Sequence, residues 1–247
     1  MIPKKLHYCW FSGEAFPENV QRCLDSWKKF LPDFEWILWD SEKARATGIP
    51  WVSEALEQKK WAFAADAVRL YALHTEGGFY LDTDVEVLRP LNSLLERPYA
   101  FGYENGSYRI EAAVMGCEAG CEPVGAALDF YRKAHFEYRE NGVDDMVLPK
   151  ILADAFEGFD GIAIMPESAF SPKSFIDGKI RKTEDTYCIH HFDSAWRPES
   201  VRKGIRRRQA LFATFPNPIA RVLAMPLSLW TNLTTLGVAG TIRKIFK

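Results

Sequence analysis

The chain has 247 residues, 47% of them hydrophobic and 14% aromatic, and a formal net charge of −2. This length suits one large α/β domain or a domain with an appendage. No run of about 20 apolar residues occurs, so we expect no transmembrane span. The N-terminus lacks the apolar run of a signal peptide, so we do not expect secretion. The five cysteines are irregularly spaced, so we expect reduced thiols in a cytoplasmic protein.

The first 40 residues predict a strand, a helix and a second strand. Residues 5–11 are apolar and aromatic, and residues 17–30 begin with proline and place apolar side chains at helical spacing. Residues 34–39 form a continuous apolar run, which is typical of a buried strand. This order begins a parallel βαβ pattern. Because ligands bind beyond the carboxyl ends of such strands, Trp10 is either a ring that stacks on a flat ligand or a core residue.

Two helices are expected next, over residues 52–59 and 61–75. In the second helix Asp66 and Arg69 are three positions apart, so they share one face. An exposed salt bridge of this kind would contribute under about 1 kcal/mol. The four alanines between positions 62 and 67 allow close packing, however, so we expect the pair to be partly buried.

The stretch from Gly77 to Asp84 combines a glycine turn, a short apolar strand over 79–81, and then Asp82 and Asp84, one residue apart. Two carboxylates at the end of a buried strand are costly unless a cation compensates them. Carboxylate oxygens suit Mg²⁺ or Mn²⁺, whose other positions are commonly filled by water and substrate phosphates. The stretch therefore predicts a metal-dependent enzyme that acts on a diphosphate-containing substrate.

Strands and helices continue to alternate toward the C-terminus. We expect strands at 85–88, 99–103, 109–115 and 161–165, a turn or short helix at 91–95, helices at 123–139 and 144–156 with Pro149 disturbing the latter, and a polar loop over the cleft at 171–185. A last strand ends in His190 and His191. Adjacent strand residues point to opposite faces, so at most one of these histidines faces a metal held by the two aspartates, and the other is structural. The sequence leaves open which one.

Two motifs together resemble a known family. They are Asp66-x-x-Arg69 on an alanine-rich helix, and Gly77-Gly78-Phe79-Tyr80-Leu81-Asp82-Thr83-Asp84. With the opening residues 2–10 and the late His190-His191 and Trp196, they resemble the DXD-containing glycosyltransferases of family 32, which include yeast mannosyltransferases and bacterial polysaccharide enzymes. The same pattern occurs in the related clostridial glucosylating toxins. The resemblance covers about residues 2–196.

The resemblance implies a GT-A fold, a Rossmann-like α/β domain that binds a UDP- or GDP-linked nucleotide-sugar with Mn²⁺ or Mg²⁺. It also implies transfer of a hexose, with retention, to a saccharide or lipid-linked saccharide in the synthesis of capsule-like surface polysaccharide or glycolipid. The metal would neutralise the departing diphosphate, and fixed hydrogen-bond donors would stabilise it further. No side chain stands out as a nucleophile, which favours front-face attack by the acceptor.

The resemblance also assigns residues to the site by their position in the motifs. The catalytic set would be Asp66, Arg69, Asp82 and Asp84, with the first two holding the donor sugar. The metal ligands would be Asp82, Asp84 and either His190 or His191. The nucleotide-sugar would be bound by Trp10 on the base, Tyr80 and Asp82 on the sugar and ribose, and Ser194 and Trp196, the last near the diphosphate.

Three positions depart from the family's pattern. Val147-Leu148-Pro149 stands where the family often has Thr-Gly-Pro, Glu111 stands where it often has asparagine, and Ala195 separates Ser194 from Trp196. These regions face the acceptor, so acceptor identity is the least transferable part of the resemblance. The donor sugar stays open as well, because a single hydrogen bond can decide between sugars.

Two other functions fit parts of the pattern. The run from Tyr80 to Val85 also fits haloacid-dehalogenase-type phosphatases, with Asp82 as nucleophile, although that motif should end the first strand of its domain. The other alternative is a non-catalytic sugar-nucleotide-binding protein. Hydrolysis of simple phosphate esters would indicate the first, and donor binding without turnover the second.

Charge divides the chain into two parts. Residues 199–247 carry nine Lys or Arg and one acidic residue, whereas residues 1–198 carry 22 basic and 32 acidic side chains. We therefore expect a GT-A domain at 1–198 and a basic amphipathic helical segment at 199–247. That segment either packs on the domain or attaches the enzyme to the inner face of an anionic membrane, and we favour attachment. The acidic body disfavours nucleic acid as a partner.

Overall fold

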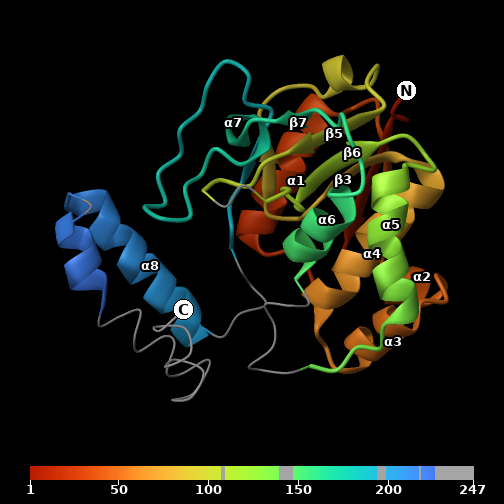
Figure 1. Cartoon of the computed structure of the whole chain (residues 1–247), viewed down its shortest axis with the longest axis horizontal. Coiled ribbons are helices and arrows are strands. Elements are labelled where there is room, and N and C mark those ends of the chain that lie inside the picture. The colour runs from red at the N-terminus through yellow and green to blue at the C-terminus, as the bar shows by residue number, and fades with distance from the viewer. Residues whose placement is uncertain (107–108, 139–146, 194–198, 217, 226–247) are drawn as a thin grey trace.

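The structure is a computed structural model that describes residues 1–106, 109–138, 147–193, 199–216 and 218–225 (Figure 1). A six-stranded mixed sheet forms its centre, in the order β2-β1-β3-β6-β5-β7. β1 (Lys5–Cys9) pairs in parallel with β2 (Glu35–Trp39) and with β3 (Gly78–Leu81). β6 (Val114–Cys117) runs antiparallel to β3 and to β5 (Tyr99–Gly102), and β7 (Ile164–Met165) lies parallel to β5. In a second sheet, β4 (Val85–Val87) pairs antiparallel with β8 (Cys188–His190).

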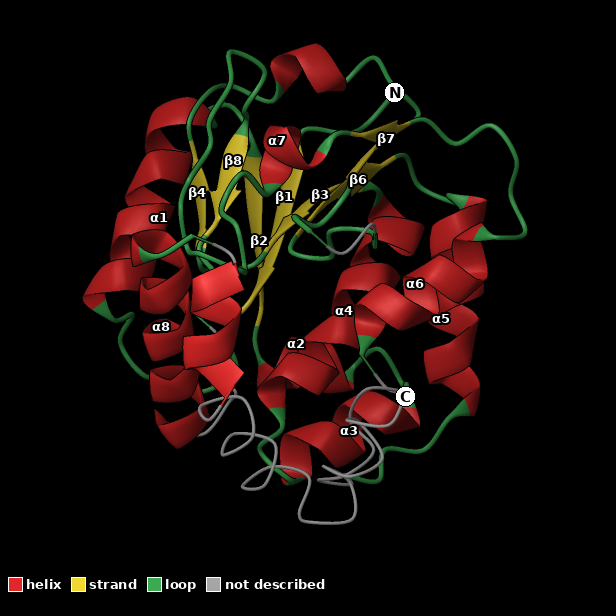
Figure 2. Ribbon diagram, turned by 60° about the vertical axis from the view of Figure 1, so that its left-hand side comes forward, coloured by secondary structure: helices red, strands yellow, loops and turns green. Residues whose placement is uncertain are grey.

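Helices cover both faces of the central sheet (Figure 2). One face carries α1 (Glu18–Phe30), and the other carries α2 (Ser41–Arg45), α3 (Pro50–Glu57), α4 (Trp61–Glu76), α5 (Glu122–Lys133) and α6 (Leu148–Phe156). The short elements η1 (Asn92–Leu94) and α7 (Glu167–Phe170) lie in connections between strands. This three-layer arrangement confirms the predicted α/β fold class.

Apolar side chains pack in two clusters, one on each face of the sheet. Trp27 of α1 packs in the cluster that contains Phe79 and Leu81 of β3, whereas Tyr80 of the same strand lies in the cluster beneath α3, α4 and α5. All four residues of β3 are buried. A strand covered on both faces is apolar throughout, which explains why the sequence of β3 does not alternate.

The turn between α4 and β3 requires glycine at two consecutive positions. Gly77 has φ +65° and Gly78 has φ +106°, both outside the range that other residues readily adopt. A Cβ on Gly77 would lie 2.7 Å from the Ala119 backbone nitrogen, and one on Gly78 would lie 2.7 Å from the Lys5 carbonyl oxygen. The start of β3 therefore lies close against β1, and this determines the position of Asp82 at the other end of the strand.

The predicted strand at 109–115 is wrong in its position. β6 covers Val114–Cys117, and upstream only an isolated bridge joins Ile110 to Tyr103 among the described residues. Glu111 interrupts the apolar run, and its Oε1 accepts the Ala113 N–H at 2.9 Å. The Glu111 side chain therefore accepts the Ala113 N–H, which in a regular strand would donate to a neighbouring strand.

Two predicted helices are shorter than their sequence pattern. The helix predicted at 123–139 ends at Lys133, because Glu54 accepts the Phe136 N–H at 2.6 Å and directs the chain toward α3. The helix predicted at 144–156 begins at Leu148, and residues 144–146 lie outside the described ranges. Pro149 does not disturb this helix, because it occupies the first turn, where its missing N–H has no helical partner to lose.

The basic segment begins as a helix, as predicted. α8 (Glu199–Thr214) lies to the side of the sheet in Figure 1, with Val201 and Gly204 buried, and residues 218–225 are also helical. Gln209 Nε2 of α8 donates a hydrogen bond of 3.2 Å to the Phe175 carbonyl in the 171–185 loop. Within the described ranges, no helix is both long enough and apolar enough to cross a membrane. The division at residue 198 stays a prediction.

Candidate functional site

The two aspartates of the DXD motif lie in the turn that joins β3 to β4. The Val85 N–H donates to the Asp82 carbonyl at 3.0 Å, which closes the turn. The Asp82 N–H also donates to the Ala113 carbonyl at 2.9 Å, so the turn is anchored beside the start of β6. Both carboxylates therefore stand at the carboxyl end of β3, where open α/β sheets bind ligands.

Arg69 connects α4 to this turn. Its side chain is 5% exposed, and its Nη2 lies 3.0 Å from Asp66 Oδ1 and 3.1 Å from Asp82 Oδ1. Nη1 lies 3.3 Å from Asp82 Oδ2 and donates to the Ala112 carbonyl at 2.6 Å. The guanidinium also lies over the Tyr80 ring, 4.6 Å from its centroid. The prediction that Asp66 and Arg69 form a partly buried pair is confirmed.

Asp66 shares its guanidinium partner with a second carboxylate. Burial raises the pKa of Asp66 to about 7, the charge of Arg69 opposes this rise, and the charge of Asp82 adds to it. Tyr80 helps to fix Asp82, because its hydroxyl donates to Asp82 Oδ1 at 3.0 Å. Asp82 is thus held by two donors in a defined orientation.

Strand pairing between β4 and β8 brings a histidine to the aspartates. Val85 is paired with His190, so the ring of His190 reaches the turn, with its Nε2 3.6 Å from Asp84 Oδ2. One ligand atom from each of Asp82, Asp84 and His190 lies within 4.8 Å of the others. His191 is directed elsewhere, with its Nε2 2.9 Å from Glu86 Oε2. The sequence left open which histidine faces the aspartates, and the geometry identifies His190 as the candidate metal ligand.

Glu111 contacts this cluster through His190, and the sequence did not predict it there. Its carboxylate, which has 2% of its surface exposed, lies 3.1 and 3.2 Å from His190 Nδ1. Burial by itself lowers the pKa of His190, but the charges of Glu111 and Asp84 outweigh burial and raise that pKa to about 10. The one signal in the sequence was an acidic residue inside the apolar run from 110 to 116. We expected Glu111 to face the acceptor, whereas it contacts the histidine of the cluster.

The donor set fits a divalent cation. Two carboxylate oxygens and one imidazole nitrogen converge, and open positions would remain for water and phosphate oxygens. The partly buried carboxylates of Asp82 and Asp84 and the buried carboxylate of Glu111 are stabilised by positive charge nearby, which His190 and Arg69 supply only in part. A cation held by Asp82, Asp84 and His190 would neutralise the negative charge of a diphosphate leaving group.

The other predicted binding residues are not all placed. Trp10 lies half-buried just beyond β1, where its Nε1 donates to the Glu14 carbonyl at 2.8 Å and its ring lies 4.9 Å from that of Phe16. Its stacking role stays a prediction. Ser194 and Trp196 lie outside the residues that the structure describes. The expected loop at 171–185 does approach the site, because Lys173 Nζ donates to the His191 carbonyl.

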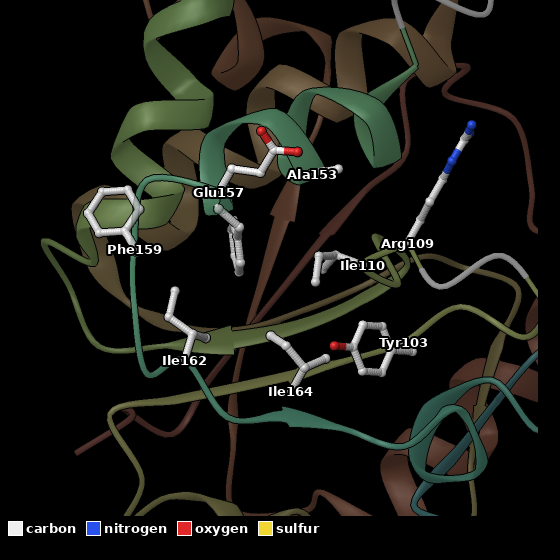
Figure 3. A pocket seen from close by; sticks show the side chains of 9 residues that line it. Tyr103, Arg109, Ile110, Ala153, Glu157, Phe159, Ile162 and Ile164 are labelled. Carbon is white, nitrogen blue, oxygen red and sulfur yellow. The ribbon is translucent and has the colours of Figure 1, made fainter.

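A pocket of about 290 Å³ lies between the C-terminal end of α6 and the edge of the sheet (Figure 3). Its lining combines aromatic and aliphatic side chains with Arg109 and Glu157; the other lining residues are Tyr103, Ile110, Ala153, Phe156, Phe159, Ile162 and Ile164. Ile110 faces this pocket, and the next residue, Glu111, contacts His190. The pocket and the carboxylate cluster thus share one backbone segment.

Comparison with known proteins supports the predicted resemblance. Residues 17–100 match the family model described as "Glycosyltransferase sugar-binding region containing DXD motif". Inositol phosphoceramide mannosyltransferase 3 of Schizosaccharomyces pombe is 37% identical over 123 residues, which cover 48% of this chain and 34% of that protein. Mannosyl phosphorylinositol ceramide synthase SUR1 of Saccharomyces cerevisiae is 33% identical over 123 residues, covering 47% and 31%. The chain thus spans about a third of the length of these curated relatives.

A solved structure agrees with the fold. The PaToxG glycosyltransferase superposes with a TM-score of 0.50 at 16% sequence identity, covering 64% of this chain and 69% of that one. At this identity the similarity concerns the fold, which is the predicted GT-A fold. The sequence match includes α4, the glycine turn and both aspartates of the site, whereas His190 and Glu111 lie outside it. Residues 17–100 of the chain are therefore similar to the DXD-containing sugar-binding region of glycosyltransferases, and the chain has the GT-A fold.

Proposed function

We propose that this chain is a metal-dependent glycosyltransferase that moves a hexose from a UDP- or GDP-linked donor to a saccharide or lipid-linked acceptor. The observation that carries the proposal is the convergence of Asp82, Asp84 and His190 within 4.8 Å, beside the buried Arg69. Three metal ligands next to a fixed guanidinium suit a substrate that carries both a diphosphate and a sugar.

The roles of the carboxylates follow from what each one contacts. Asp84 and Asp82 hold the cation, and Asp82 is fixed for this by Arg69 and Tyr80. Asp66, which is paired with Arg69 on the α4 side, accepts a hydrogen bond from a hydroxyl of the donor sugar. Trp10 stacks on the base, and Ser194 and Trp196 complete the diphosphate site.

The transfer proceeds with retention by front-face attack. The C1–O bond to the diphosphate breaks while a bond from C1 to the acceptor oxygen forms on the same face of the sugar. The acceptor's proton passes to a phosphate oxygen of the leaving group. Two carboxylates near the cluster are already engaged, Asp66 by Arg69 and Glu111 by His190 and Ala113, which supports a route without a protein nucleophile.

The ligand set favours Mn²⁺ over Mg²⁺. Mg²⁺ prefers an all-oxygen shell and gives up its waters reluctantly, whereas imidazole is a better ligand for the later divalent metals of the first transition row. His190 offers such a nitrogen 3.6 Å from Asp84. We therefore expect tighter binding and faster transfer with Mn²⁺.

The names of the relatives suggest where to look for substrates. Both are named for a mannosyl product on an inositol phosphoceramide, a lipid-linked acceptor. We propose a GDP- or UDP-linked hexose as donor, with GDP-mannose as the first to test, and a saccharide or lipid-linked acceptor in surface polysaccharide or glycolipid synthesis. The pocket of Figure 3 suits such an acceptor, because aromatic rings and polar side chains line it together.

The basic segment supports a place at a membrane surface. Residues 218–225 bury the small side chains of Ala220 and Ala224 and expose large apolar ones between 44% and 66%; the exposed residues are Ile219, Val222, Leu223 and Met225. Lys203, Arg207 and Arg221 are exposed nearby in sequence. Basic and large apolar side chains together suit an anionic lipid surface, so we propose peripheral attachment at the inner face of a membrane.

Calorimetric titration of nucleotide-sugars tests the donor site. Wild type, Asp84→Asn and the control Glu86→Gln are each titrated with a panel of UDP- and GDP-sugars, with Mn²⁺ and with EDTA. We expect Mn²⁺-dependent binding of one donor in wild type and in the control, and loss of that binding in Asp84→Asn. Absence of binding of every donor in wild type would remove the proposed function.

Two alternatives are tested with the same proteins. The phosphatase reading needs a free Asp82 oxygen, but Arg69 and Tyr80 both engage Asp82, which also follows the third strand of the chain rather than the first. Hydrolysis of simple phosphate esters that Asp82→Asn abolishes would support a phosphatase. A donor that binds without hydrolysis or transfer would indicate a sugar-nucleotide-binding protein.

A further inference from the structure

Glu111 is buried, and its carboxylate has defined hydrogen-bond partners. Glu111 is 1% exposed, its Oε1 accepts the Ala113 N–H at 2.9 Å, and both of its oxygens lie within 3.2 Å of His190 Nδ1. A buried carboxylate without partners would be strongly destabilising, so these contacts account for its presence in the core. The Ala113 N–H holds one oxygen locally, and both oxygens face the Nδ1 of His190.

This contact determines how the imidazole presents itself to the aspartates. A carboxylate can only accept, so Nδ1 must carry the hydrogen that is shared with Glu111. The other nitrogen, Nε2, faces Asp84 Oδ2 at 3.6 Å, on the side of the three-ligand cluster. A neutral ring with hydrogen on Nδ1 has its lone pair on Nε2, which is the form that binds a metal.

The ring of His190 is also held from its face. The ring of Phe192 lies 3.9 Å from it between centroids, at an interplanar angle of 33°. Phe192 has φ +53°, a left-handed conformation that is rare and strained for a bulky residue. The surrounding structure thus keeps a strained residue where it covers the imidazole, while Glu111 fixes the ring's rotation.

We propose that Glu111 is a positioning residue that selects the Nδ1–H form of His190 and aims Nε2 at a divalent cation shared with Asp82 and Asp84. The carboxylate of Glu111 would then act on the cation through His190, because it orients the ring and makes Nε2 more basic. The inference rests on the metal site of the proposed function and extends it to a residue outside the matched region 17–100. Where the resembling family often has a neutral asparagine, this chain has a charged acceptor.

The test is the Mn²⁺ affinity of Glu111→Gln, measured by the EPR signal of free Mn²⁺ on the full chain. Glutamine has the same length and can still accept from Ala113, so the fold should survive, and thermal unfolding of the metal-free protein checks this. Glu86→Gln is the matched control, because it removes a carboxylate from the other histidine, His191. We expect Glu111→Gln to weaken Mn²⁺ binding about 10- to 100-fold, and the control to change it less than about twofold.

Three outcomes are separable. Unchanged Mn²⁺ affinity in Glu111→Gln would overturn the positioning role while leaving the metal site intact. An equal loss in Glu111→Gln and Glu86→Gln would also overturn it, because charge alone would then explain the effect. Absence of Mn²⁺ binding in wild type would remove the metal site of the proposed function, and the inference with it.

A spectroscopic readout distinguishes positioning from simple structural support. Zn²⁺ is a diamagnetic probe for the same ligands, and histidine-selective ¹⁵N and ¹H NMR reports the state of each ring nitrogen. In Zn²⁺-loaded wild type we expect His190 to be metallated at Nε2, with an Nδ1 proton at low field, as in a strong hydrogen bond to a carboxylate. That proton should move to higher field in Glu111→Gln and stay in place in Glu86→Gln. Metallation at Nδ1 in wild type would contradict the proposal.

Discussion

Arg69 holds Asp82 by both terminal nitrogens, with Nη2 3.1 Å from Oδ1 and Nη1 3.3 Å from Oδ2. Asp66 shares the same guanidinium at 3.0 Å. A paired, planar contact of this kind fixes the orientation of the carboxylate as well as its charge. The helix that carries Arg69 therefore determines the geometry of the DXD turn, although the two residues are separated by 13 positions along the chain.

Replacing Arg69 by methionine should be strongly destabilising. The change leaves Asp66 and Asp82 without their shared counter-charge in a largely buried place, and breaking such a pair costs about 3–5 kcal/mol. Urea unfolding measures the loss. Arg132→Met is the control, because its contact with Asp129 at 3.1 Å is exposed on α5 and should contribute under about 1 kcal/mol. Similar losses of unfolding free energy in the two variants would show that the contacts of Arg69 stabilise the protein no more than an exposed salt bridge does.

Asp66→Asn should separate sugar recognition from metal binding. Asp66 is paired with Arg69 and is not one of the three converging ligands, so the variant should bind Mn²⁺ as wild type does. A charge-assisted hydrogen bond to a sugar hydroxyl contributes about 1.5–3 kcal/mol, so kcat/KM for the donor should fall about 10- to 100-fold. Steady-state donor hydrolysis and Mn²⁺ titration are measured on one preparation. A loss of Mn²⁺ affinity comparable to that of Asp84→Asn would assign Asp66 to the metal instead.

Acid should destabilise the protein through His7. This residue is fully buried, its Nδ1 accepts from Trp39 Nε1 at 3.1 Å, and its Nε2 lies 2.9 Å from the Gly77 carbonyl, an arrangement that fits only the neutral ring with hydrogen on Nε2. Burial lowers the pKa of His7, with the Gly77 hydrogen bond opposing. Because the pKa in the folded protein is below the unfolded value near 6.5, the unfolded chain takes up the proton first. Stability is therefore retained above about pH 6.5 and lost as the pH falls below it, by up to about 1.4 kcal/mol per pH unit.

Urea unfolding between pH 5 and pH 8 checks the role of His7. His7→Gln should be less stable at pH 8 but should lose less stability on acidification than wild type. His135→Gln is the control, because the hydrogen bond from exposed His135 to Glu54 raises the pKa of His135, so its contribution is present at low pH and declines as the pH rises. A His7→Gln profile parallel to that of wild type would contradict the prediction.

Gly78→Ala should destabilise the junction of α4 and β3. Gly78 has φ +106°, and a Cβ there would lie 2.7 Å from the Lys5 carbonyl oxygen, a backbone atom that cannot move aside without disturbing β1. Backbone strain alone costs about 1–3 kcal/mol, and the overlap adds to it. Gly48→Ala is the control: its φ is +70° but no atom lies within 4 Å of the added Cβ, so only the left-handed penalty of about 1–2 kcal/mol remains. Equal melting temperatures for the two variants would argue against a tight β3–β1 approach.

Membrane attachment should depend on the apolar face of residues 218–225. The double variant Val222→Ser, Met225→Ser removes side chains that are 66% and 65% exposed, and it should reduce flotation of the full chain with anionic liposomes while leaving the melting temperature unchanged. Leu38→Ser, at a 39% exposed position of β2, is the control and should float as wild type does. High salt should weaken flotation through the basic residues. Equal flotation of the wild type and the double variant would remove this attachment role.

Patterns among residues close together in sequence determined much of the secondary structure and part of the candidate site. The β1-α1-β2 start, the α4 face that carries Asp66 and Arg69, the Gly77-Gly78 turn and the paired aspartates could all be read from residues close together in sequence, because helix periodicity, glycine turns and buried strands are local properties. Local signals failed where a distant partner intervened. Glu54 ended α5 early through Phe136, and Glu111 displaced the predicted strand by accepting the Ala113 N–H.

Only the tertiary structure decided how the site is completed. The choice of His190 over His191 depends on the pairing of β8 with β4, in which a shift of one residue would exchange the two rings. The contact between Glu111 and His190 joins residues 79 positions apart, and no spacing rule connects them. The sequence showed two carboxylates at the end of an apolar strand and so predicted a cation there, because charge and burial can be predicted along a single strand. The third candidate ligand, His190, and the carboxylate that contacts it, Glu111, come from separate segments, so their contact depends on how the chain packs rather than on any local pattern.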